Sequence, residues 1–106
     1  MPLPDLTTLQ FAVLLALGAV ERSGKELRER LAKEGVSKTL AAFYQLMARM
    51  EDAKLVEGSY RRAEVAGQPV QERWYKITAA GIRAYNEAQA FYRSAPALGR
   101  KGAANV

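Results

Sequence analysis

The reactive side chains of this sequence offer little for catalysis, since the chain contains no cysteine and no histidine. Thiolate nucleophiles, imidazole bases and the usual transition-metal ligands are therefore missing. The carboxylates of Glu51 and Asp52 are adjacent in sequence, and adjacent residues of a helix point about 100° apart, so these two cannot act as a catalytic dyad. We expect no enzyme activity, no catalytic residue, no metal and no cofactor.

The side chains around residues 38–52 are better suited to binding a nucleic acid. Apolar residues recur there at spacings of 3, 4 and 3 and predict the buried stripe of a helix: Leu40, Phe43, Met47 and Met50. Lys38, Gln45 and Arg49 fall on the opposite side. A glutamine can bridge adenine, and an arginine can contact guanine or a phosphate. The alternative is a solvated face on a structural helix.

Two small residues, Ala41 and Ala42, lie on the same side of this helix. They allow close approach to a groove or contact with a thymine methyl group, or they are simply good helix formers. The helix begins after an N-cap that is either Ser37 or Thr39, and the sequence does not decide between them.

A basic hairpin follows this helix. Its predicted arms are Tyr60–Val65 and Val70–Ile77, joined by a loop over 66–69 that contains Gly67 and Pro69. Its positive residues are Arg61, Arg62, Arg73 and Lys76. We expect these cations to contact phosphates, although charge on a hairpin edge also resists aggregation. Trp74 and Tyr75 are expected to be core or interface residues.

These segments need three further helices to position them. The first runs from Thr7 or Thr8, as the cap, to about Leu17. The second covers Gly24 to Glu34, and Ser23 with Glu26 forms a capping box at its start. A short turn over 35–37 then leads into the third helix, which gives a helix-turn-helix. The last helix begins after Thr78 and runs to about Arg93.

The first and last helices carry more apolar surface than one small core needs. Every residue from Phe11 to Leu17 is apolar, and the last helix has two apolar stripes. A helix that is apolar all round is buried on more than one face. We therefore expect a homodimer, whose interface would contain Phe11, Leu14, Leu15, Tyr85, Ala88, Phe91 and Tyr92.

Length and composition indicate one domain with a polyanionic partner. The 106 residues carry 16 Lys and Arg against 11 Asp and Glu, for a net charge of +5. We assign residues 1–94 to the folded domain and predict a disordered basic tail over 95–106. The longest apolar run, Phe11–Val20, is half the length of a membrane span, and no basic leader precedes it, so we expect a cytoplasmic protein without a membrane partner.

A helix followed by a basic hairpin is typical of a winged helix-turn-helix, which lays one helix in the DNA major groove beside a β-wing. The predicted fold is α+β, mainly α, with three helices, a two-stranded wing and a C-terminal dimerisation helix. The expected DNA-binding residues are Lys38, Thr39, Ala42, Gln45, Arg49, Arg61, Arg62, Gln68 and Arg73. The partners expected are double-stranded DNA and a second copy of the chain.

From Leu6 to Tyr92, the order and spacing of these segments resemble the PadR-like winged-helix transcriptional regulators. The family shows a tyrosine, two core residues at three and six residues on, an acidic residue and then Leu-Val. Here these are Tyr44, Met47, Met50, Glu51 and Leu55-Val56. The family also shows a Gly-Arg-Pro wing tip and aromatics before Leu-Thr-x-x-Gly. Here these are Gly67-Gln68-Pro69, Trp74-Tyr75-Lys76-Ile77-Thr78 and Gly81.

The resemblance implies a homodimeric regulator, expected to be a repressor, of the compact type without the large C-terminal coiled coil. It also implies a possible small-molecule effector in the dimer cleft. Two features depart from the family, namely Gln68 in place of the wing-tip arginine and the pair Ala41-Ala42 on the recognition helix. They motivate an alternative function as a winged-helix protein-interaction module without specific DNA binding.

Overall fold

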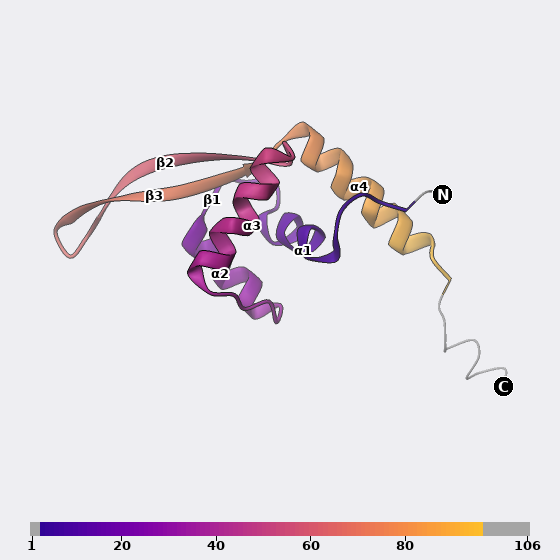
Figure 1. The fold of residues 1–106 in the computed structure, drawn as a ribbon, viewed down its shortest axis with the longest axis horizontal. Helices are drawn as coiled ribbons and strands as arrows, with labels where there is room; N and C mark the ends of the chain where they lie inside the picture. Colours follow the sequence, from indigo (N-terminus) through magenta and orange to yellow (C-terminus); the bar gives the residue numbers. More distant parts are fainter. Residues whose placement is uncertain (1–2, 97–106) are drawn as a thin grey trace.

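A computed structural model describes residues 3–96, which form four helices and three strands. In chain order these are α1 (Thr8–Leu17), β1 (Arg22–Ser23), α2 (Gly24–Lys33), α3 (Leu40–Asp52), β2 (Val56–Val65), β3 (Gln68–Ile77) and α4 (Ala79–Ser94). The body contains α1, α2 and α3, and the β2–β3 hairpin and α4 extend from it in opposite directions (Figure 1). The predicted mainly α winged helix is confirmed.

Each helix begins at a hydroxyl residue that caps it. At α1 the choice is Thr7, because its hydroxyl accepts from the backbone N–H of Gln10 at 3.0 Å and its own N–H donates to the Gln10 side chain at 3.0 Å. At α3 the cap is Thr39, whose hydroxyl accepts from the Ala42 N–H at 3.1 Å. Thr78 caps α4 as predicted.

The capping box predicted at α2 is only half formed. The Ser23 hydroxyl accepts from the backbone N–H of Glu26 at 3.1 Å. The Glu26 carboxylate does not return to the cap, however, because it pairs with Arg22 at 2.6 Å. Arg22 also donates to the backbone carbonyl of Leu17 at 2.8 Å, so this pair joins the end of α1 to the start of α2.

The core lies between the three N-terminal helices and the base of the sheet. Its fully buried members include Val13, Leu17, Leu27 and Met47. From α3 the buried residues are Phe43, Leu46, Met47 and Met50. The prediction that Leu40 belongs to this stripe is wrong, since its side chain is 52% exposed. Leu40 is the first residue of α3, where side chains tilt towards the helix start and project beyond the packed turns.

The antiparallel sheet has the order β1-β3-β2. The hairpin pairs continuously from Val56 with Ile77 to Val65 with Gln68, so its arms are longer than predicted and Pro69 lies in a strand. The turn is only Ala66-Gly67, with φ of 52° and 79°. Two successive positive φ angles are typical of the type I′ turn that suits hairpin twist. Strand β1 was not predicted, because two residues are too short to form a pattern.

Helices α1 and α4 pack through aromatic rings. The Phe11 ring stacks on Tyr85 at a centroid distance of 4.9 Å and meets the edge of Tyr92 at 5.7 Å. Two residues predicted at a dimer interface belong instead to the core of the single chain: Leu14 is 2% exposed and Ala88 is fully buried. Both are covered because α4 packs against α1 within the single chain. On the sequence alone, this apolar face was assigned to a second subunit.

The remaining predictions on organisation are only partly addressed by the structure. Helix α4 ends at Ser94, where the sequence placed the end of the domain. Most of the tail predicted over 95–106 lies outside the described residues. Within residues 3–96, no helix is long and apolar enough to cross a membrane.

Candidate nucleic-acid interface

The exposed face of α3 carries the side chains that the sequence assigned to base contacts. Gln45 and Arg49 are exposed, as is Lys38 just before the helix, while Ala42 is half-buried. Thr39 differs from them because its hydroxyl oxygen already accepts from the Ala42 N–H. Its O–H therefore remains to donate to a phosphate. Ala41 and Ala48 are also exposed, and their small side chains add no bulk to this face.

The two faces of the β2–β3 hairpin carry different residues. Directly paired residues share a face of a sheet, so Tyr60 with Arg73 and Arg62 with Gln71 lie on one side. That side faces α3, because Arg73 contacts Glu51 of the helix. On the opposite side, Arg61 pairs with Glu72 and Trp74 with Ser59. The three arginines of the hairpin therefore do not form a single basic surface.

Arg73 is held by protein partners and is not directed at solvent. Its Nη2 donates to Glu51 Oε1 at 2.6 Å, and its guanidinium lies over the rings of Tyr60 at 4.5 Å and Tyr75 at 5.6 Å. Burial lowers the pKa of Arg73, but the hydrogen bond and charge of Glu51 outweigh it, so the pKa is raised. A phosphate contact by Arg73 was predicted, and the structure gives the residue another role.

Arg61 is also engaged. Its Nη2 pairs with Glu21 Oε1 at 2.5 Å, and its guanidinium lies 4.0 Å from the centre of the Trp74 ring. The Trp74 indole N–H in turn donates to Glu72 at 3.3 Å. Trp74 is half-buried under this arginine, and Tyr75 is buried in the core. The expectation that both aromatics serve packing is consistent with these positions.

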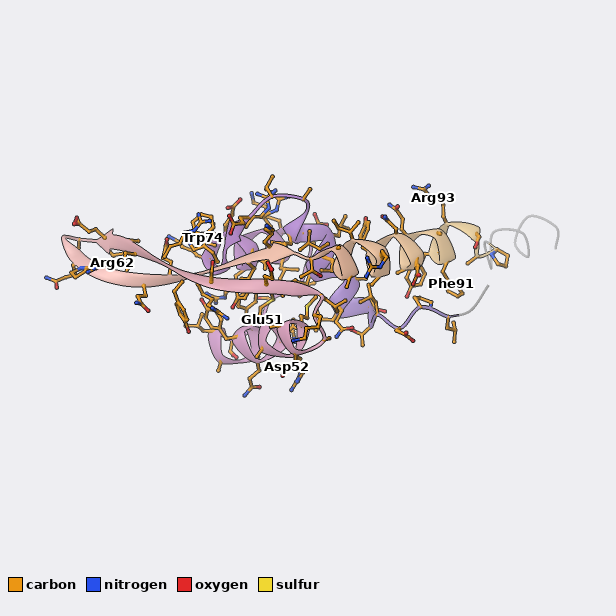
Figure 2. The ribbon with its side chains drawn as sticks, turned by 90° about the horizontal axis from the view of Figure 1, so that it is seen from above. Glu51, Asp52, Arg62, Trp74, Phe91 and Arg93 are labelled. Carbon is orange, nitrogen blue, oxygen red and sulfur yellow. The ribbon has the colours of Figure 1, made fainter. Side chains whose placement is uncertain are left out.

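Arg62 differs from its two neighbours. It is exposed on the α3-facing side of the hairpin, and among residues 3–96 its side chain has no hydrogen bond, ion pair or ring contact. Figure 2 shows Arg62 towards the free end of the hairpin, beyond Trp74. Gln68 is exposed beside the turn. Of the predicted hairpin contacts, Arg62 and Gln68 are thus free to meet a ligand.

One basic residue that the sequence did not assign to the interface belongs to α2. Arg28 lies 6.0 Å from the Phe43 ring and lines a small cavity of about 80 Å³ together with Ser37 and Lys38. The turn over 35–37 brings α2 and the start of α3 together, so two cations and a hydroxyl converge there. Such a set suits a phosphate oxygen. The short Gly-containing turn was the signal that could have located it.

The apolar surface expected at a dimer interface lies along α1 and α4. Leu15 is 54% exposed and Tyr92 is 47% exposed, whereas Phe11, Tyr85 and Phe91 are half-buried. Ile82, which was not assigned there, is also exposed. A groove of about 230 Å³ runs between the helices and is lined by Leu14, Leu15, Gly18, Ala19, Ile77, Ile82 and Tyr85. Apart from Leu14 and Ala88, the predicted interface residues therefore gather on one surface.

Solved structures with the same fold include PadR-like transcriptional regulators. A PadR-like transcriptional regulator from Bacillus cereus is 26% identical, with 79% of this chain and 80% of that chain covered and a TM-score of 0.65. A PadR family regulator from Eggerthella lenta is 27% identical, with coverage of 81% and 72% and a TM-score of 0.62. The resemblance predicted from the sequence is confirmed.

A third structure includes nucleic acid. Bacillus subtilis PadR, solved in complex with operator DNA, is 18% identical, and 90% of this chain covers 52% of that chain with a TM-score of 0.65. At that identity the likeness concerns the fold alone. No protein-family model and no curated protein sequence matches the chain.

Proposed function

We propose that this chain, which has the fold of the PadR-like winged-helix regulators, is a DNA-binding transcriptional regulator that acts as a homodimer. The observation that carries the proposal is the exposed polar face of α3, where Gln45, Arg49 and Lys38 stand free beside a projecting hairpin. A helix presented in this way enters the major groove of a duplex. The operator complex of the Bacillus subtilis protein supports this use of the fold.

In the proposed mode of binding, one set of residues contacts the bases and another contacts the phosphates. Gln45 and Arg49 contact base edges in the major groove, where Ala41 and Ala42 allow the helix to approach closely. Lys38, Thr39 and Arg28 hold the phosphates beside the start of α3. Of the wing, Arg62 and Gln68 lie along the backbone and set the register without reading sequence. Arg61 and Arg73 make no phosphate contact in this proposal and instead hold the wing through their ion pairs with Glu21 and Glu51.

The homodimer would form through α1 and α4. The exposed Leu15, Ile82 and Tyr92 provide an apolar surface that a second copy would cover. Two copies related by a two-fold axis would read a pseudo-palindrome, with half-sites roughly 34–36 Å apart or at a multiple of that spacing. The groove between the helices would then lie near the dimer cleft, where a small-molecule effector is expected. Action as a repressor in the cytoplasm completes the proposal.

A protein-interaction module is the second candidate. It is favoured by Gln68, which gives the wing tip no charge, and by Ala41 and Ala42, which make no directional contact. The two candidates differ in whether a duplex binds at all. Catalysis has no support, since the neighbouring structures are transcription factors.

Selection from a random duplex library tests the proposed function. Purified protein is expected to enrich a pseudo-palindromic site whose half-sites are about one helical turn apart. A matched selection with the variant Gln45→Ala is expected to relax the preference at one position of each half-site. If the protein enriches no site and retains no duplex at low salt, the interaction module replaces the regulator.

A further inference from the structure

We propose that Glu51 is a positioning residue for DNA binding, because its ion pair with Arg73 fixes the angle between the wing and the recognition helix. The inference about DNA rests on the proposed function, whereas the inference about wing geometry does not. Glu51 lies on the side of α3 that faces the hairpin, and its neighbour Asp52 points away (Figure 2). The two carboxylates therefore have different roles despite being adjacent.

The ion pair lies where the hairpin leaves the body. Tyr75 is buried in the core, and the next residue outward on the same face of β3 is Arg73. Beyond it, within the described part of the chain, no side-chain hydrogen bond or ion pair holds residues 62–71. On the α3 side, the contact between Arg73 and Glu51 is thus the outermost polar link between the wing and the helix.

A glycine near the start of β2 leaves room for this link. A Cβ at Gly58 would lie 2.5 Å from Arg73 Nη2 and 2.6 Å from Glu51 Oε1, closer than such atoms approach. Glycine weakens a strand interior, so its presence there indicates that something else requires the space. At Gly58 the space is filled by the two charged groups. With any larger residue there, the Arg73 or the Glu51 side chain would have to move from its present position.

Stacking makes the pair more rigid than a surface ion pair. The Arg73 guanidinium lies over Tyr60 at 4.5 Å and over Tyr75 at 5.6 Å, so rings from both strands flank it while Glu51 binds its Nη2. A planar guanidinium loses little freedom when it is already stacked. The other face of the hairpin is held by Arg61 and Glu21, which are both more exposed and therefore form the weaker link.

Whether removing the Glu51 charge weakens or strengthens DNA binding distinguishes a positioning role from an effect of charge alone. Glu51 and Asp52 are both negative groups near the proposed DNA surface, and removing either raises the net charge by one. On electrostatics alone, both variants would bind a duplex as tightly as the wild type or more tightly. If Glu51 positions the wing, Glu51→Gln instead weakens binding, while Asp52→Asn does not. Asp52→Asn is therefore the matched control.

The geometric test uses spin labels and no DNA. The chain has no native cysteine, so Ala41→Cys on α3 and Gln68→Cys beside the wing turn accept two labels cleanly. Labelled protein is mixed with excess unlabelled protein, and the distance distribution is measured by pulsed electron paramagnetic resonance. Glu51→Gln and Arg73→Gln are each expected to broaden it, the double variant to broaden it no further, and Asp52→Asn to leave it unchanged. An unchanged distribution in Glu51→Gln, or fully additive single effects, would overturn the proposal.

The functional test measures binding of a random-sequence duplex at low salt. Glu51→Gln is expected to lose affinity about three- to fivefold, the loss typical of a partly exposed pair, while Asp52→Asn loses none. Equal or higher affinity for Glu51→Gln would overturn the positioning role. If the wild type binds no duplex, the proposed function fails, and the spin-label result still decides whether Glu51 holds the wing.

Discussion

Replacing Arg62 by alanine should reduce the salt dependence of duplex binding, whereas replacing Arg61 should leave it nearly unchanged. The two residues are adjacent, both are exposed, and both substitutions lower the net charge by one. They differ in the face of the hairpin on which they lie and in their partners. Arg61 is bound to Glu21 at 2.5 Å and stacked on Trp74, while Arg62 has no such contact among the described residues.

The expected magnitude follows from counting phosphates. Each phosphate contact to B-DNA contributes about −0.9 to the slope of log K against log salt. Between 50 and 200 mM salt, loss of one contact therefore removes about 3.5-fold of the change in affinity. For Arg61 to make such a contact it would first have to give up an ion pair and a stacked ring, together worth about 1–2 kcal/mol. Arg61 is thus expected to keep its protein partners.

Fluorescence anisotropy with a labelled random-sequence duplex of about two helical turns measures both slopes. The Arg62→Ala slope is expected to be shallower than the wild-type slope by about 0.9 per protomer, and the Arg61→Ala slope is expected to stay within error of it. Circular dichroism confirms that both variants are folded. If Arg61→Ala flattens the slope as much as Arg62→Ala does, the assignment of separate roles to the two arginines is wrong.

Three further predictions concern association, pH and the turn. Leu15→Lys should convert the proposed dimer to a monomer in sedimentation experiments. Leu40→Lys, at a leucine of similar exposure on α3, should not, and dissociation in both variants would show that the α1–α4 surface is not the interface. Burial raises the pKa of Tyr75 to about 12, so one of the five tyrosines should ionise late at 295 nm. The phenol of Tyr75 in the unfolded chain has a pKa near 10, so the stability is retained below about pH 10 and falls by roughly 2–3 kcal/mol as the pH rises to 12. A titration at 295 nm in which no tyrosine ionises late would contradict this. Ala66→Asn should raise the free energy of unfolding in urea by about 0.5–1 kcal/mol, since Asn-Gly suits two successive positive φ angles, and a loss of stability would rule out the type I′ assignment.

Much of the fold could be predicted because its signals are local. Hydroxyl caps, the helical spacing of Phe43, Met47 and Met50, and the glycine turn each act within a few residues. Several of the errors occurred where distant segments meet. Strand β1 exists only because Arg22 and Ser23 pair with β3, and Leu14 and Ala88 are buried only because α4 crosses α1.

The candidate site was harder to predict for the same reason. Sequence places Arg61, Arg62 and Arg73 in one basic hairpin but gives no sign of which cations are already paired. Their partners, Glu21 and Glu51, come from segments 40 and 22 residues away. Strand alternation separates Arg61 from Arg62, but the identity of each partner depends on packing. Which arginines on each face of the hairpin are paired and which are free therefore depends on the tertiary structure.

Salt dependence of duplex binding by the wild-type protein tests the central claim most directly. Arg28, Lys38 and Arg62 of two protomers would together give a linear plot of log K against log salt with a slope of about −5. The account predicts tight binding at 50 mM salt that weakens along this line. Absence of duplex binding at that salt concentration, or a slope near zero, would contradict it.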